Sequence, residues 1–285
     1  MSATSTGALS KVSLMPSWSK YPPAEPGALG REPLKAVGRV ANAARSVWSR
    51  LKAASGEIAL DSYMKRHPPA NPYALPSRAG SLDLVAGALA LDFTNTSSGR
   101  GSPTHQEHLR DFETLVRWIE HARVVTPADC AHLREAATRE PKRAAAIFRR
   151  ALAVRELIWQ IGEALADRRP IPPAWLAELT ATHAKNLAFA EMKWRDDLFI
   201  WTWDPRRDNE AAILGPITLS ALSLLMEKDV LRTKRCEGKE CGWLFYDVTR
   251  NRSRRWCEMR VCGQRAKAHA ARDRRMAGEV VSSSG

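Results

Sequence analysis

The 285-residue chain lacks the short motifs that mark the common nucleotide-binding and hydrolytic enzymes. Its central region has no Gly-rich phosphate loop, no His-Glu-x-x-His pair and no nucleophile elbow. The histidines there are scattered, although His105 and His108 precede Asp111 at a spacing that could place three metal ligands on one helical face. A solvated helix start is the interpretation we favour for them. We therefore predict that the protein is not an enzyme, and we keep as an alternative a site assembled from residues far apart in sequence.

Long apolar runs are also absent. The longest uncharged stretch, from Ala211 to Met226, has sixteen residues and contains Gly215 and Pro216, so it is too short and too interrupted to span a bilayer. We interpret it as a buried helix and predict no membrane span. The N-terminal residues show no succession typical of a secretory signal, which predicts a cytoplasmic protein with reduced thiols.

Cysteine is scarce outside one region, where four of the five cysteines stand in two close pairs. Cys236 and Cys241 form the first pair, and Cys257 and Cys262 form the second after fifteen intervening residues. Two such pairs let one Zn²⁺ join two turns that could not bury a core of their own. Because all four ligands would be sulfur, we predict one closed, structural zinc ion rather than a catalytic one. Two disulfides or four unrelated thiols are the alternatives, and Cys130 is expected to be a core or half-buried thiol.

Lys and Arg outnumber Asp and Glu toward both ends of the chain, and the formal net charge is +13. Residues 1–80 carry +7, residues 81–231 carry −2, and residues 232–275 carry +9 from fourteen Lys and Arg against five acids. This asymmetry is typical of proteins that bind a polyanion, either nucleic acid or an anionic membrane surface. Basic segments that are merely solvated are the simpler alternative.

Residues 1–80 hold nine of the seventeen prolines and few acids, a composition that rarely packs a core. We predict that this basic extension is mostly disordered. Within it, residues 33–64 place apolar side chains near helical spacing, with Lys and Arg between them. Such a helix could touch lipid or DNA, although a partly formed helix with a solvated face is the interpretation we favour.

The hydrophobic pattern after residue 81 predicts an α+β fold, a mainly helical domain with a small sheet or hairpin, followed by a small four-cysteine zinc-finger module. Thr126, Pro127 and Asp129 supply an N-cap, a first-turn proline and an early acid for one of the helices. The expected helices cover residues 104–121, 126–138, 141–168, 175–182 and 213–231. The expected strands lie within residues 82–96 and form a hairpin from residues 187–193 and 198–203.

Three segments that contain or flank the cysteines have a distinctive sequence. They are Cys-Gly-Trp-Leu-Phe-Tyr-Asp at 241–247, the Arg-rich residues 250–259, and Cys-Gly-Gln-Arg-Ala-Lys at 262–267. Together they closely resemble the CGNR zinc-finger family. In that family an ABATE-type domain precedes the finger, and residues 87–96, 115–118 and 213–217 look like its recurring segments. One departure is that the signature Asn is replaced by Gln264, whose head group is displaced by an extra methylene.

The resemblance covers about residues 82–275 and suggests a division of the chain. We expect the N-terminal extension to be followed by an ABATE-like domain, a four-cysteine finger with a basic C-terminal helix, and a short tail. These parts correspond to residues 1–80, 81–231, 232–277 and 278–285.

The resemblance implies a transcription regulator whose finger binds DNA and whose middle domain senses a signal or small molecule of unidentified chemistry. We expect duplex DNA as the partner, with most contacts made to phosphates. The basic side chains expected to contact it are Arg250, Arg252, Arg254, Arg255, Arg265, Lys267 and Arg272.

Other functions stay open at this stage. An RNA-binding or ribosome-associated protein is the second hypothesis, because Trp243 or Trp256 could stack on unpaired bases. We nevertheless assign both tryptophans to a small core of the finger itself. A redox switch that releases zinc on thiol oxidation is another alternative. The oligomeric state does not follow from the sequence.

Overall fold

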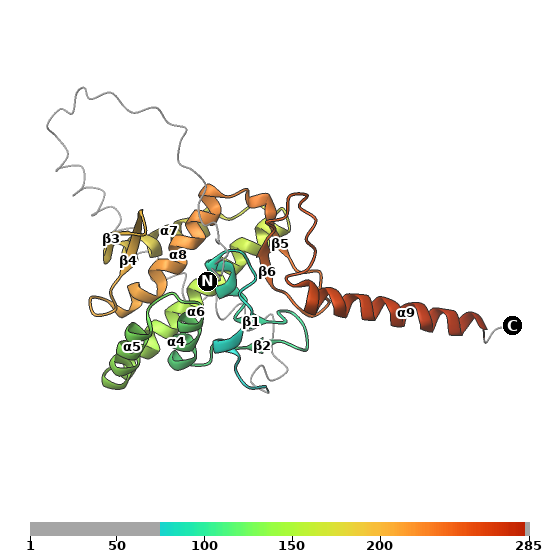
Figure 1. Cartoon of the computed structure of the whole chain (residues 1–285), viewed down its shortest axis with the longest axis horizontal. Helices are drawn as coiled ribbons and strands as arrows, with labels where there is room; N and C mark the ends of the chain where they lie inside the picture. The colour runs from blue at the N-terminus through green and yellow to red at the C-terminus, as the bar shows by residue number, and fades with distance from the viewer. Residues whose placement is uncertain (1–74, 283–285) are drawn as a thin grey trace, which may run out of the picture. The chain divides into compact units, whose positions relative to one another are not determined.

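The computed structural model of the chain describes residues 75–282 (Figure 1). The predicted helix within residues 33–64 and most of the N-terminal extension lie outside this range. Helices dominate the described part, together with short 3-10 turns and one π-helical turn. They are α3 (Leu89–Thr94), α4 (Phe112–His121), α5 (Pro127–Arg139), α6 (Pro141–Ala166), α7 (Pro173–Leu187), α8 (Asn209–Glu227) and α9 (Gln264–Ser282).

The strands form three separate antiparallel pairs. They are β1 (Ser97–Ser98) with β2 (Gln106–Glu107), β3 (Ala190–Arg195) with β4 (Leu198–Trp203), and β5 (Thr233–Arg235) with β6 (Leu244–Tyr246). The first pair lies between α3 and α4, the second between α7 and α8, and the third between α8 and α9. This arrangement confirms the predicted class, a mainly helical α+β protein that ends in a zinc-finger module.

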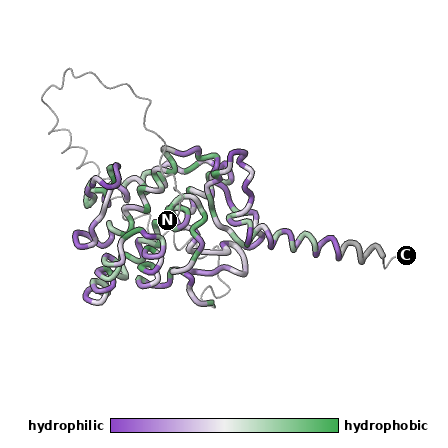
Figure 2. Tube along the Cα trace, in the orientation of Figure 1, coloured by the Kyte–Doolittle hydropathy of each residue, from purple (hydrophilic) through white to green (hydrophobic). Residues whose placement is uncertain are grey.

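Helix α6 lies at the centre of the helical part and packs against α3, α4, α5, α7 and α8. Its predicted inward stripe is buried, from Ile147 through Val154 to Ile161. In the same core, Phe93 of α3 meets Trp118 of α4 with ring centroids 5.0 Å apart. Hydrophobic and hydrophilic stretches alternate along the trace in Figure 2, as expected for amphipathic helices around a common core.

Side-chain caps explain where two of these helices begin. The hydroxyl of Thr126 accepts from the backbone N–H of Asp129 at 3.2 Å, and the Asp129 carboxylate accepts from Thr126 N–H at 3.3 Å. This reciprocal capping box confirms the predicted start of α5. Asp111 and Thr114 form the same arrangement at the start of α4, with 2.7 Å between the Asp111 carboxylate and Thr114 N.

Two predictions for the first part of the domain were wrong. The segment expected to form strands contains α3, because Leu89, Ala90 and Phe93 lie close to i, i+4 spacing and pack into the same core. The helix expected from residue 104 begins only at Phe112, since the preceding residues form β2 and a buried loop. An apolar run this short cannot be assigned to strand or helix from its periodicity alone.

The remaining boundaries differ by a few residues. Helix α7 is longer than expected at both ends, and the hairpin begins at Ala190 rather than near residue 187. Helix α8 starts earlier than predicted, ends at Glu227, and is followed by a 3-10 turn at Val230–Arg232. Among the described helices α8 alone is long and apolar enough to cross a membrane, but half of that stretch is buried, which agrees with a core helix.

Candidate metal centre and nucleic-acid interface

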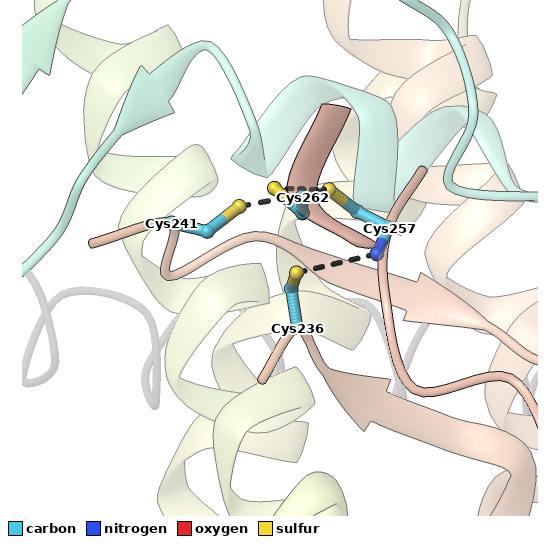
Figure 3. Close-up of side chains that lie close together, drawn as sticks. All are labelled: Cys236, Cys241, Cys257 and Cys262. Carbon is cyan, nitrogen blue, oxygen red and sulfur yellow. Dashed lines mark hydrogen bonds between the residues drawn. The ribbon is translucent and has the colours of Figure 1, made fainter. Parts of the chain in front are cut away.

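The two cysteine pairs, which fifteen residues separate along the chain, meet at one point (Figure 3). Cys236 directly follows β5, Cys241 lies just before β6, and Cys262 sits in the π-helical turn Met259–Gly263 that leads into α9. All four sulfur atoms lie within 4.8 Å of one another, and Cys257 Sγ is 3.6 Å from Cys241 Sγ and 3.5 Å from Cys262 Sγ. A Zn²⁺ ion held tetrahedrally by thiolates at about 2.3 Å requires sulfurs about 3.8 Å apart. The cluster is therefore positioned to bind one zinc ion.

The surroundings of the sulfurs suit a closed structural site. Cys236, Cys257 and Cys262 are buried, and Cys241 is half-buried. The backbone N–H groups of Gly238 and Cys257 donate to Cys236 Sγ at 3.4 and 3.3 Å, which offsets the negative charge of a bound thiolate. Gly238 has little room for a side chain, because a Cβ there would lie 3.1 Å from Cys241 Cβ and 3.4 Å from two of the sulfurs.

The hydrophobic residues of the finger do not form a core of their own. Leu244 and Phe245 of β6 are fully buried in a cluster that also contains Leu91 of α3 and Trp159 of α6. Helix α6 approaches β6 so closely that a Cβ on Gly162 would lie 2.7 Å from Leu244 Cδ1. The prediction that the finger has a small core of its own was wrong, because its apolar residues share a core with α3 and α6. A sheet of two three-residue strands has too little apolar surface to form a separate core.

Comparison with known families agrees with this geometry. A family model for ABATE, described as "Putative stress-induced transcription regulator", matches residues 87–228, and the CGNR zinc finger model matches residues 232–275. The chain therefore matches both family models, each over a part of its length. It carries an ABATE domain ahead of its CGNR finger, in the order expected from the sequence. A comparison with curated proteins found no match.

The ABATE domain supplies backbone partners to the finger as a further strand would. Tyr246 N–H donates to Ala86 O at 2.7 Å, and Gly99 N–H donates to Cys241 O at 2.8 Å. Between them the Asn95 side chain bonds both backbone groups of Leu244. The main chain of the finger, at Cys241 and along β6, is therefore held by hydrogen bonds from residues 86–99.

Arg254, one of the predicted nucleic-acid contacts, is used inside the protein. Its guanidinium group donates to Val85 O at 2.8 Å and to the carbonyl oxygens of Trp256 and Cys257. It also lies over the Phe245 ring, 4.4 Å from the centroid. These contacts join Val85, β6 and the second cysteine pair, so the guanidinium group of Arg254 holds these segments of the protein together.

Asp247 organises the loop between β6 and the second cysteine pair. Its fully buried carboxylate accepts from Lys234 Nζ at 2.8 Å, from the Thr249 hydroxyl at 2.6 Å and from Arg254 N at 3.0 Å. Burial acts to raise the pKa of Asp247, but these hydrogen bonds outweigh it and hold the pKa well below its usual range. The sequence analysis missed this residue, since an acid in a basic segment carries no signal of its burial.

The other predicted contacts divide into paired and unpaired side chains. Arg252 pairs with Asp229 at 2.7 Å, and Arg255 pairs with Glu237 at 2.5 Å, both at the surface. The rest are exposed and have no ion pair within residues 75–275: Arg250, Arg265, Lys267 and Arg272. Three of these four stand on α9, where every side chain from Gln264 to Arg275 is exposed or half-buried.

The ABATE domain contains a buried charge cluster that the sequence analysis also missed. Arg155 on α6 bonds both carboxylate oxygens of Glu107 at 2.6 and 2.7 Å, and Arg100 bonds Glu156 at 2.5 and 3.0 Å. All four residues are buried. The cluster fixes the loop at residues 96–108, whose Ser98 accepts a hydrogen bond from Trp243 Nε1 of the finger at 3.1 Å.

His105 and His108 belong to the same loop and are not a solvated helix start. Both are buried, and they contact the hydroxyl groups of Ser97 and Ser98 at 2.9 and 3.1 Å. Burial lowers the pKa of His108 to about 4, so this imidazole is neutral at physiological pH. Asp111 caps α4 instead, and the four cysteines are the only group of three or more metal-ligating side chains gathered within the described part of the chain.

Proposed function

We propose that the protein is a DNA-binding transcription regulator that contacts duplex DNA through α9 and the adjacent loop at Arg250. The observation that carries the proposal is the distribution of charge on α9. Successive side chains on a helix turn by about 100°, so Arg265 and Arg272 lie on one side of α9 while Lys267 and Arg274 lie on the opposite side.

Basic groups on opposite sides of one exposed helix suit a groove between two rows of phosphates. The major groove of B-form DNA is about 12 Å wide and admits an α-helix. The major groove of A-form RNA is too deep and narrow for one. A flat anionic membrane could engage only one side of α9 at a time. These shapes favour duplex DNA over the RNA alternative.

In this proposal the zinc ion has a structural role. When bound, it would link the two cysteine pairs and so fix the π-helical turn that sets the direction of α9. Arg250 would reach phosphates from the loop, while Gln264 stands exposed at the start of α9 and could contact a base edge.

The shared core suggests how a signal could reach the finger. A change in the ABATE domain that moved α3 or α6 would act on β6 directly, because Leu91, Trp159 and Leu244 pack in one cluster. This route supports the part of the proposal in which the ABATE domain regulates the finger. The family description, a regulator of transcription, supports it over the enzyme alternative.

The test compares the full-length, zinc-loaded chain on duplex DNA and duplex RNA of equal length across a range of salt concentrations. We expect DNA to bind more tightly, with an affinity that falls steeply with salt and is lost on zinc chelation. Replacing Arg265, Lys267 and Arg272 together with Ala should reduce the slope of log K against log salt by about 2 to 3, at about 0.9 per phosphate contact.

Arg195→Ala is the matched control, because Arg195 is an exposed arginine of the β3–β4 hairpin and its removal should leave binding unchanged. Thermal unfolding of each variant would show that α9 substitutions leave the fold intact. Equal affinity for DNA and RNA, or an unchanged salt slope in the triple variant, would overturn the proposal.

A further inference from the structure

Between its two basic sides, helix α9 has two further sides that differ in chemistry. Because each residue turns the helix by about 100°, Ala268 and Ala271 lie within about 40° of Gln264. Asp273 lies about 180° from Gln264, on the opposite side, and His269 is near it. The phosphates on both edges of a groove repel a carboxylate. The side that carries Gln264 is therefore the one that suits the floor of a DNA groove.

The basic side chains frame the Gln264 side of the helix. Arg265 and Arg272 lie about 80 to 100° from Gln264 in one direction around the axis. Lys267 and Arg274 lie about 60 to 80° from it in the other direction, and all four basic side chains are exposed. With the Gln264 side toward the bases, each basic row faces one of the two phosphate backbones. Turning α9 over would keep both rows near phosphates but would bring its acidic side to the bases.

Gln264 offers a side-chain amide that the protein itself does not use. The side chain is exposed and makes no hydrogen bond within the described part of the chain. The preceding residue, Gly263, is buried, and a Cβ there would collide with Met259 Sδ and lie 3.0 Å from Trp256 Cδ1. The backbone N–H of Gly263 also donates to Glu258 O at 3.2 Å. The backbone at the start of α9 is thus fixed against the finger, which is what recognition of a base by a side chain requires.

We propose that α9 enters the major groove with its Gln264 side toward the bases, and that Gln264 selects an adenine. The proposal rests on the proposed function, because it needs duplex DNA in contact with α9. Among the four bases, adenine alone presents an acceptor, N7, beside a donor, the N6 amino group, and a glutamine amide matches both. Guanine presents two acceptors there and leaves the Gln264 carbonyl oxygen without a partner. Ala268, one turn farther on, is too short to hold the helix away from the bases.

The first measurement is the selection of binding sites from duplex DNA with a randomised central segment, using the full-length, zinc-loaded chain. We expect the selected duplexes to share an adenine at one position. Gln264→Arg should change that position to guanine, whose O6 and N7 both accept from an arginine, and should leave the neighbouring positions unchanged. His269→Arg is the matched control, because it adds the same group to the far side of α9, at an exposed position, and should keep the adenine.

The second measurement tests whether the Gln264 amide itself makes the contact. On the selected duplex, 7-deazaadenine at that position removes the N7 acceptor and keeps the base pair. We expect this base to weaken binding of the wild type roughly fivefold, the effect of one lost hydrogen bond, and to leave Gln264→Ala unaffected. Gln264→Ala should also keep the wild-type slope of log K against log salt, because glutamine neutralises no phosphate.

The outcomes distinguish failure of this proposal from failure of the proposed function. If the chain binds duplex DNA with a steep salt dependence but selects no common sequence, the assignment of Gln264 is wrong and the proposed function stands. The same holds if Gln264→Arg selects the wild-type sequence, or if 7-deazaadenine weakens wild type and Gln264→Ala equally. If the chain binds no duplex DNA, both are wrong. Zinc content and far-ultraviolet circular dichroism verify that each variant is folded.

Discussion

Asn95 bonds both backbone groups of Leu244, donating from Nδ2 to the carbonyl oxygen at 2.9 Å and accepting at Oδ1 from the N–H at 2.9 Å. Asn95 follows α3 in the ABATE domain, whereas Leu244 begins β6 of the finger. Both residues are buried, so no water can replace these bonds. The Asn95 side chain therefore pairs with the backbone N–H and C=O of Leu244, as a neighbouring strand would in a larger sheet.

Replacing Asn95 with Ala should destabilise the ABATE domain and the finger together. The substitution leaves a buried donor and a buried acceptor of Leu244 without partners, at a cost of about 1–3 kcal/mol each. We expect urea unfolding monitored by circular dichroism to show one transition at lower urea concentration. Asn251→Ala, in an exposed loop of the finger, is the control and should leave the midpoint in place.

Zinc removal should affect more than the finger. Because Cys236, Cys257 and Cys262 lie in one cluster with Leu91 and Trp159, chelation should lower the melting temperature of the whole described unit. Metal analysis should give one zinc per chain for the wild type and less than one for Cys257→Ser. Cys130→Ala should keep its zinc, as this buried thiol belongs to the core of the helical part. If the helices kept their melting temperature after zinc removal, the inference that the finger and the helices share one core would be wrong.

The contact between α6 and β6 can be tested with one methyl group. Gly162→Ala would place Cβ 2.7 Å from Leu244 Cδ1, closer than packed carbon atoms approach. We expect a loss of about 1–3 kcal/mol in the free energy of unfolding, the usual effect of overpacking a core. Adding Leu244→Val to this variant should restore part of the loss. Gly80→Ala, where a Cβ would meet nothing within 4 Å, should be close to neutral.

Asp92 should make stability depend on pH. Burial raises the pKa of Asp92 to about 6, and hydrogen bonds from Ala86 and Val85 together with the charge of Arg254 only partly offset it. Because the pKa is higher in the folded chain than in the unfolded one, the stabilising contribution is complete below about pH 4 and is lost as pH rises through about 6. The shift corresponds to about 3 kcal/mol at most.

The measurement for Asp92 is a comparison of wild type with Asp92→Asn at each pH, so that the pH dependence of the zinc thiolates cancels. Asparagine can still accept from Ala86 N–H, which bonds Asp92 Oδ1 at 2.9 Å. We expect the variant to gain stability relative to the wild type between pH 4 and 7. A difference that stays constant across this range would show that Asp92 titrates normally.

The sequence alone was sufficient to predict those elements that are determined by residues close together in the chain. Thr126 and Asp129 indicated the start of α5, the stripe from Ile147 to Ile161 predicted α6, and the hairpin followed from alternation in its strands. The four cysteines determined the zinc site because metal ligation depends on residue type and spacing. The resemblance to the CGNR zinc finger, which the family models bear out, followed from the same residues and their flanks.

Only the tertiary structure showed the features that depend on contacts between residues far apart in the sequence. Residues 89–94 became α3 because the surrounding helices and β6 bury its sides, which periodicity over six residues cannot reveal. Arg254 and Arg265 look alike in the sequence, yet the first is enclosed by carbonyl groups and an aromatic ring while the second stands exposed on α9. Whether a charged side chain is enclosed by the protein or exposed to solvent depends on residues far away along the chain. Only the packed fold brings those residues beside it.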